Sequence, residues 1–164
     1  MLGERLIAHQ WCICNNGGMV HSAVDEVASN CLAVRVRLLG RAVTSLYDHA
    51  LEEHGVSIAQ INLMAALGKM GPCSPARIGE VLQLERSTVS RNLSLLMKHG
   101  WVDAVSANAK GVREVALTPA GRQKIETVMP AWRRAQQEAA ELLGSGGVKA
   151  VRTLATNVVR SVGD

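Results

Sequence analysis

Apolar residues recur at steps of three and four along most of this 164-residue chain, which is the spacing of helices with one buried face. The longest such pattern runs from residue 24 to 54 and predicts one long amphipathic helix ending at Gly55. A second helix is expected at about 58–70, where apolar residues lie on most sides and Gly71-Pro72 ends the pattern. The N-terminal part is therefore expected to be helical.

The C-terminal part repeats this spacing in two stretches. Thr118 followed by Pro119 predicts a helix start, because Thr caps a first turn and Pro loses no hydrogen bond at the first helical position. We expect this helix to continue to residue 143 with a kink at Pro130. After a loop at 144–147, a last helix is expected at 148–162.

Between these parts, two short helices follow each other almost without a spacer. Ser74 and Pro75 predict the start of the first helix, for the reasons given for Thr118 and Pro119. The second begins near Glu85, and its spacing buries Val89, Leu93 and Leu96. The opposite side of its first two turns then carries Ser87, Thr88, Ser90 and Arg91. Hydroxyl and guanidinium groups of this kind suit base edges and phosphates of duplex DNA.

A β-hairpin is expected next. Residues 101–105 and 112–117 alternate like two strands, with Val115 and Leu117 inward, around a polar tip. The tip carries Lys110, and Arg113 is expected just inside the second strand, where both cations reach a phosphate or the minor groove. Two helices and a hairpin in this order predict a winged helix-turn-helix, a DNA-binding fold, within a mainly α-helical chain.

Three runs of this sequence resemble the multiple antibiotic resistance regulator (MarR) family: residues 78–91 (IGEVLQLERSTVSR), 98–102 (KHGWV) and 115–121 (VALTPAG). The resemblance extends from about Ala28 to the C-terminus. It implies a homodimer of winged-helix protomers that binds a pseudo-palindromic DNA operator, usually as a repressor released by a small ligand or an oxidant.

By this resemblance and the residue pattern together, the residues expected to contact DNA are Arg86, Ser87, Thr88, Ser90, Arg91, Lys110 and Arg113. The family commonly has an Asp and, two residues on, an Arg at the wing tip. The corresponding residues here are Ala109 and Gly111. Lys110 or Arg113 would therefore take the place of the wing arginine.

The charge of the chain agrees with a polyanionic partner. The formal net charge is +4, and residues 85–114 hold five Lys or Arg against three acids. Aromatic residues make up only 2% of the chain, which leaves few stacking platforms for RNA or single strands. Duplex DNA is the favoured nucleic acid.

The resemblance and the helical pattern together divide the chain into functional regions within one compact domain. Residues 57–117 form the DNA-binding region, and residues 24–56 and 118–164 are the expected dimerisation helices. A two-fold dimer would deliver two reading helices about 34–36 Å apart, one duplex turn. Residues 1–23 form an N-terminal extension, and the natural start is hypothesised to be Met19.

An effector site is predicted near the junction of the dimerisation and DNA-binding regions. In this family an acidic aromatic effector binds there, and the candidate residues are Arg35, Arg41, Tyr47 and Met64. The alternatives are that the arginines are solvated or paired with nearby acids, and that Tyr47 and Met64 belong to the core.

The cysteines give a second, thiol-based or metal-responsive hypothesis for the same fold. Peroxide-sensing family members place a reactive cysteine in the first long helix, but our alignment puts Ala33 there, two residues from Cys31. A buried core thiol is the alternative for Cys31, and a thiolate would require a cation such as Arg35. Cys12 and Cys14 offer donors for a soft metal, but their spacing is not a structural zinc pattern, so we predict no metal and no cofactor.

Other classes of protein are less well supported. The chain has no glycine-rich phosphate loop, nucleophile elbow or paired acid and base, so we predict that it is not an enzyme. Residues 6–24 lack charges but are interrupted by polar residues and Gly, so neither a membrane span nor a signal peptide is expected. We expect a cytoplasmic protein. A winged helix used as a protein-binding, anti-repressor module without DNA binding stays open.

Overall fold

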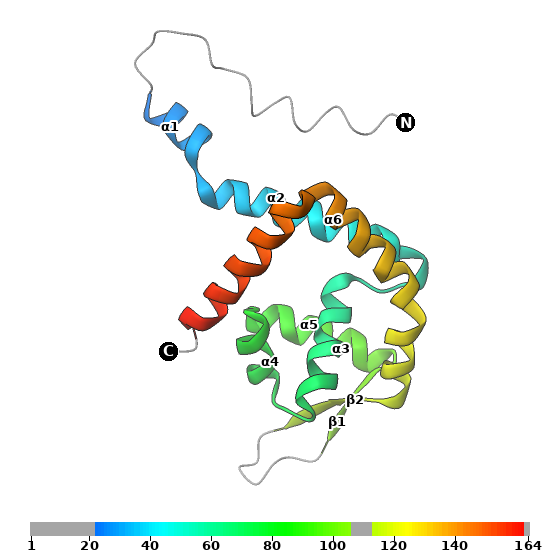
Figure 1. Ribbon diagram of the computed structural model, residues 1–164. Coiled ribbons are helices and arrows are strands. Elements are labelled where there is room, and N and C mark those ends of the chain that lie inside the picture. Colours follow the sequence, from blue (N-terminus) through cyan, green and yellow to red (C-terminus); the bar gives the residue numbers. More distant parts are fainter. Residues whose placement is uncertain (1–21, 106–112, 163–164) are drawn as a thin grey trace. The chain divides into compact units, whose positions relative to one another are not determined.

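The computed structural model of the chain describes residues 22–105 and 113–162. In chain order the elements are α1 (Ala23–Asn30), α2 (Leu32–Leu51), the 3-10 helix η1 (Glu52–His54), α3 (Ile58–Met70), α4 (Pro75–Leu82), α5 (Arg86–Lys98), β1 (Val102–Val105), β2 (Glu114–Leu117) and α6 (Pro119–Val162) (Figure 1). The predicted fold class, mainly helical with a small β-hairpin, is confirmed. The chain divides within α2 into two compact units, Met1–Ala42 and Val43–Asp164.

The described part of the first unit holds a broken helix where the sequence predicted a continuous one. Ser22 caps α1 through a capping box with Asp25, and α1 ends at Cys31, whose backbone is extended (φ −65°, ψ 107°). The guanidinium of Arg35 donates to the carbonyl oxygen of Ser29, which α1 leaves without a helical partner. The sequence has neither Gly nor Pro at this break. The Ser and Asn that precede it weaken a helix only by offering the backbone local hydrogen bonds, so they do not predict that a helix ends there.

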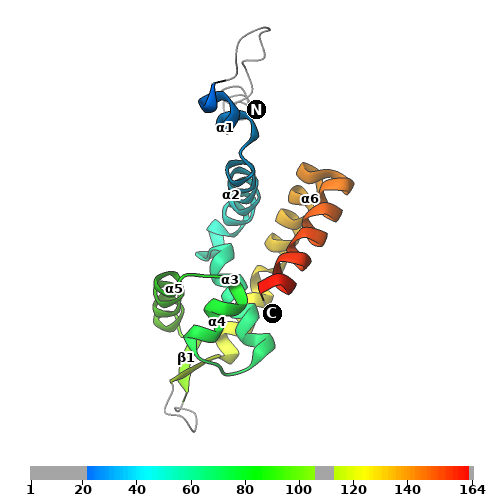
Figure 2. The same cartoon turned by 90° about the vertical axis from the view of Figure 1, so that its left-hand side faces the viewer.

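The second unit is built around α3. The bounds of α3 match the prediction, and Gly71 ends the helix with φ 77°. At its start, Ser57 and Gln60 form a capping box that was not predicted. Its residues are apolar on most sides because it contacts α4, β2 and α6 (Figure 2). Its buried side chains are Ile58, Ile61, Leu63, Met64 and Leu67.

The C-terminal helix departs from the prediction at one of its glycines. Pro130 lies inside α6 with helical backbone angles. A break in the helical backbone occurs at Gly144, whose φ of 67° and ψ of 168° are the only non-helical angles within α6. The other residues of the expected 144–147 loop are helical, because a glycine costs a helix only about 1 kcal/mol.

The hairpin pairs β1 with β2 in antiparallel register, with Val102 opposite Leu117 and Val105 opposite Glu114. Val102 and Val115 are buried, and Leu117 is half-buried. Both strands are shorter than predicted, so Trp101 precedes β1 and Arg113 precedes β2 instead of lying inside it. No helix among the described residues is both long and apolar enough to cross a membrane.

Candidate nucleic-acid interface

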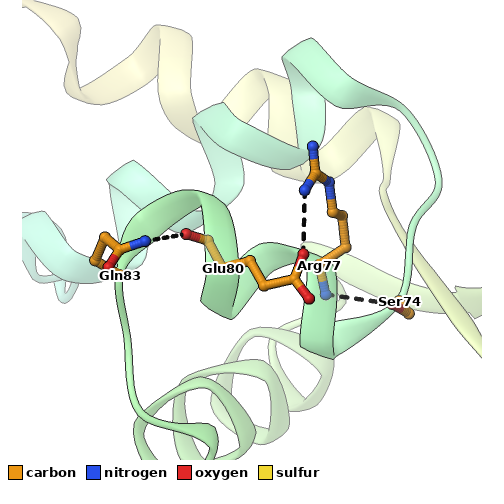
Figure 3. A network of polar contacts seen from close by, with 4 residues as sticks. All are labelled: Ser74, Arg77, Glu80 and Gln83. Atoms are coloured by element: carbon orange, nitrogen blue, oxygen red, sulfur yellow. Dashed lines mark hydrogen bonds and ion pairs between the residues drawn. The ribbon is translucent and has the colours of Figure 1, made fainter. Parts of the chain in front are cut away.

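The first helix of the pair, α4, begins and ends with side-chain hydrogen bonds (Figure 3). The hydroxyl of Ser74 accepts from the Arg77 N–H at 3.3 Å, as the sequence predicted for this cap. Arg77 pairs with Glu80 at 3.1 Å, and the Gln83 amide donates to the Glu80 carbonyl at 2.7 Å. Ser74 and Gln83 thereby satisfy backbone groups at the two ends of this short helix.

The turn between α4 and α5 is tight enough to constrain two residues. Gln83 has φ 52°, the only positive φ of a non-glycine residue in the described chain. A Cβ at Gly79 would lie 3.0 Å from the Leu84 carbonyl oxygen and 3.6 Å from Val89 Cγ2. Glycine therefore lets α4 approach the turn and the start of α5 closely.

The second helix, α5, has one buried and one exposed face, as its spacing predicted. Val89, Leu93 and Leu96 are buried at 1%, 5% and 0% exposure. The exposed side chains of its first two turns are Arg86, Ser87, Ser90 and Arg91, while Thr88 is half-buried. Further along, Ser94, Leu95 and Lys98 are exposed as well.

Side chains on the exposed face of α5 hydrogen-bond to their own helix. Arg91 Nε donates to the Ser87 carbonyl oxygen at 3.2 Å, and Ser94 Oγ donates to the Ser90 carbonyl at 3.0 Å. The Arg91 bond uses the Nε–H and orients the guanidinium along the helix. Its terminal nitrogens carry the paired donors that match a guanine edge or a phosphate.

The base of the hairpin is held by a cluster that the sequence analysis missed. The rings of His99 and Trp101 stack with centroids 4.5 Å apart, and Lys124 Nζ lies 4.9 Å from the Trp101 ring centroid. Lys124 also donates to the His54 carbonyl at 2.6 Å, so it joins α6 to η1 and to the hairpin. The sequence gives no signal for this, because the partners are far apart in the chain.

The predicted wing contacts are described only in part. Arg113 is exposed and directly precedes β2. Lys110, Ala109 and Gly111 lie outside the described residues.

The predicted effector residues fall into two groups by burial. Met64 is fully buried and Tyr47 is 9% exposed, and both belong to the core. The Tyr47 hydroxyl donates to Gln136 Oε1 at 2.6 Å, and burial raises the pKa of Tyr47. Of the arginines, Arg35 and Arg41 are exposed on α2, and Arg35 donates to the Ser29 carbonyl. The core interpretation of Tyr47 and Met64 therefore fits the structure.

A surface hollow of about 560 Å³ lies at the end of α2 and the start of α3, lined by Ser45, Asp48, His49, Glu52, Gly55, Val56, Ser57 and Gln60. Asp48 already accepts from the Ile58 N–H at 2.7 Å, and His49 lies 3.7 Å from Glu52. This lining has two carboxylates and neither Lys nor Arg. Its charge is opposite to the one that an acidic aromatic effector requires.

The two cysteines in the described residues are half-buried free thiols. Cys31 lies at the break between α1 and α2 rather than within a helix. Burial raises the pKa of the Cys73 thiol, the Glu114 carboxylate raises it further, and Arg77 opposes both. Cys73 is therefore protonated and weakly reactive at neutral pH. No cluster of metal-ligating side chains occurs among the described residues, and Cys12 and Cys14 lie outside them.

The adjacent helices α4 and α5, the tight turn and the antiparallel hairpin define a winged helix-turn-helix protein. Comparison with known proteins narrows this class. The MarR family profile matches residues 54–111. The HTH-type transcriptional regulator YwoH of Bacillus subtilis is 27% identical over 88 residues, which are 54% of this chain and 64% of the length of YwoH.

Solved structures share the fold at low sequence identity. A MarR mutant from E. coli complexed with operator DNA has a TM-score of 0.71 at 19% identity, covering 82% of this chain and 97% of that one. Bordetella bronchiseptica BpsR, whose DNA binding is regulated by 6-hydroxynicotinic acid, has a TM-score of 0.68 at 18% identity, covering 79% and 95%. The resemblance to the MarR family is confirmed, and the chain has the fold of MarR-family transcriptional regulators.

Proposed function

We propose that this protein is a homodimeric transcriptional regulator that binds a specific duplex DNA operator, acts as a repressor and is released by a small-molecule effector. The observation that carries the proposal is the outward face of α5. Ser87, Ser90 and Arg91 are exposed there, opposite the buried Val89 and Leu93, on the second helix of a winged helix-turn-helix. This is the position from which such helices read the major groove.

The charge and hydrogen bonding of this face suit DNA. Serine hydroxyls both donate and accept, and the terminal nitrogens of Arg91 make a bidentate pair with guanine O6 and N7. Arg86 and Lys98, at the two ends of α5, supply phosphate contacts, and Arg113 braces the backbone from the hairpin. The operator complex of the E. coli MarR mutant, which shares this fold, supports the assignment.

A second copy of the chain would cover exposed apolar surface on the flanking helices. In the first unit these residues are Val24, Val27, Leu32 and Val36, each at least 65% exposed. On the C-terminal half of α6 they are Val151, Leu154 and Val158, each at least 40% exposed. Large apolar side chains repeated along helices in this way are typical of an interface between subunits.

Release by an effector is compatible with the same arrangement. A ligand that binds one spacing of the two reading helices better than another shifts the population away from the DNA-binding form. The regulation of BpsR by 6-hydroxynicotinic acid provides the precedent within the fold. Exposed arginines such as Arg35 and Arg41 provide the charge for an acidic aromatic ligand.

An electrophoretic mobility shift with the DNA upstream of its own gene tests the proposal. We expect a specific complex whose affinity falls linearly with salt concentration on a double logarithmic scale. Arg91→Ala should weaken that complex by about 1–3 kcal/mol for each reading helix, because one bidentate base contact is lost. Arg133→Ala, which removes an exposed arginine from α6, should leave the affinity nearly unchanged.

Two results would contradict the proposal. One is equal affinity of wild type and Arg91→Ala for the same operator. The other is a protein that forms no salt-sensitive specific complex with any duplex, which would favour the protein-binding module instead.

A further inference from the structure

One residue on the outward side of α5 is apolar. Leu95 is 46% exposed, whereas Leu93 and Leu96 beside it are buried in the core. At about 100° per residue, Leu95 lies about 40° around the helix axis from Arg91 and about 20° from Thr88. Leu95 therefore lies on the same side of the helix as Arg91 and Thr88, two of the residues proposed to contact DNA.

The major groove offers a leucine one apolar partner. Its base edges present hydrogen-bond donors and acceptors, except for the C5-methyl group of thymine, which projects into the groove. We infer that Leu95 contacts a thymine methyl group in each half of the operator, an inference that rests on the proposed function and adds a specificity-determining residue to it. Burial of the leucine against the methyl removes apolar surface of both groups from water.

The geometry of the helix also limits where that thymine lies. Leu95 follows Arg91 by four residues, which is about 6 Å along the helix axis. Base pairs are spaced about 3.4 Å apart along a duplex, and a helix in the major groove runs obliquely to the duplex axis. The thymine is therefore expected no more than about two base pairs from the base that Arg91 contacts.

Removing single methyl groups from the DNA tests this inference. Operator duplexes are first selected from a random pool by the wild-type protein, and each thymine is then replaced by deoxyuridine, which keeps the base pair and deletes the methyl. For wild type, we expect each half-site to contain one sensitive thymine. Replacing that single thymine should weaken binding about fourfold, the effect of removing one buried methyl-sized group. For Leu95→Ala, the same replacement should have no effect, because the contact is already missing.

Met97 provides the matched control on the same helix. It is 37% exposed but lies about 160° around the axis from Leu95, toward the edge of the buried face. Met97→Ala should therefore keep the wild-type sensitivity to deoxyuridine. If Leu95→Ala keeps that sensitivity too, or if no thymine of a selected operator is sensitive, the inference is wrong while the proposed function stands. If the random pool yields no enriched sequence, the proposed function fails and this inference with it.

Discussion

Gly121 is the position at which the structure leaves least room for a side chain. A Cβ there would overlap the carbonyl oxygen of Trp101 and lie 2.6 Å from Leu117 Cδ1. The Trp101 carbonyl accepts from the Thr118 N–H at 3.1 Å, and the Gly121 N–H donates to the Thr118 hydroxyl at 3.0 Å. Gly121→Ala would therefore force apart the base of the hairpin and the first turn of α6.

The expected loss of stability follows from these contacts. Overpacking a close contact costs about 1–3 kcal/mol, and loss of the hydrogen bond between Thr118 and Trp101 adds about 1 kcal/mol. The higher helix propensity of alanine offsets about 1 kcal/mol of this loss of stability. We expect Gly121→Ala to lower the free energy of unfolding by about 1–3 kcal/mol, measured by urea denaturation at fixed protein concentration.

Gly146→Ala is the control from the same helix. A Cβ at Gly146 meets nothing within 4 Å, so this change should raise stability by up to about 1 kcal/mol. Equal stability of Gly121→Ala and wild type would refute the reasoning, since the base of the hairpin would then accommodate a Cβ without any loss of stability. Opposite signs for the two glycines would support it.

Two further predictions concern the core and the proposed subunit interface. Because burial raises the pKa of Tyr47 above its ordinary value near 10, the stability that its protonated form provides is present below pH 10 and lost as the pH rises beyond it. Tyr47→Phe, which also loses the bond to Gln136, should remove this component from the urea midpoints measured between pH 9 and 11; an unchanged alkaline slope would contradict the assignment. Leu154→Glu should weaken the free energy of dimerisation by at least about 1.5 kcal/mol for each leucine lost from the interface, because burying a leucine side chain contributes ~1.5–3 kcal/mol. Thr156→Glu, on the opposite side of the helix, should leave the dimer unchanged. Sedimentation equilibrium distinguishes these outcomes, and a Leu154→Glu protein that stays dimeric would exclude this face from the interface.

The parts of the fold that depend on local rules could be predicted from the sequence. Ser74 and Thr118 cap their helices as expected, and the three-and-four spacing of α5 identified its buried residues. The break at Cys31 could not be predicted, because no residue there forbids a helix. The kink at Gly144 was anticipated only as a four-residue loop, since glycine content does not say which glycine leaves the helix.

The candidate site was predictable to the same extent. The exposed face of α5 follows from periodicity alone, and so Ser87 and Arg91 could be selected before the fold was known. The base of the hairpin could not be, because Lys124 meets His54 and Trp101 only through tertiary packing. For Tyr47 and Met64 the sequence left two alternatives open, an effector site and the core. Helical spacing cannot separate them, since an apolar residue on a helix fits both a pocket and a core.

The cluster at the hairpin base also gives the protein a built-in optical reporter. Trp101 has an imidazole stacked on its ring and an ammonium group 4.9 Å from the ring centroid, and both groups influence the emission of an indole. Trp101 joins the end of α5 to the start of β1, so any movement between α5 and the hairpin alters the surroundings of its ring. With Trp11 and Trp132 replaced by Phe, the fluorescence of this one side chain could be recorded during titrations with duplex DNA or candidate ligands, without an attached dye.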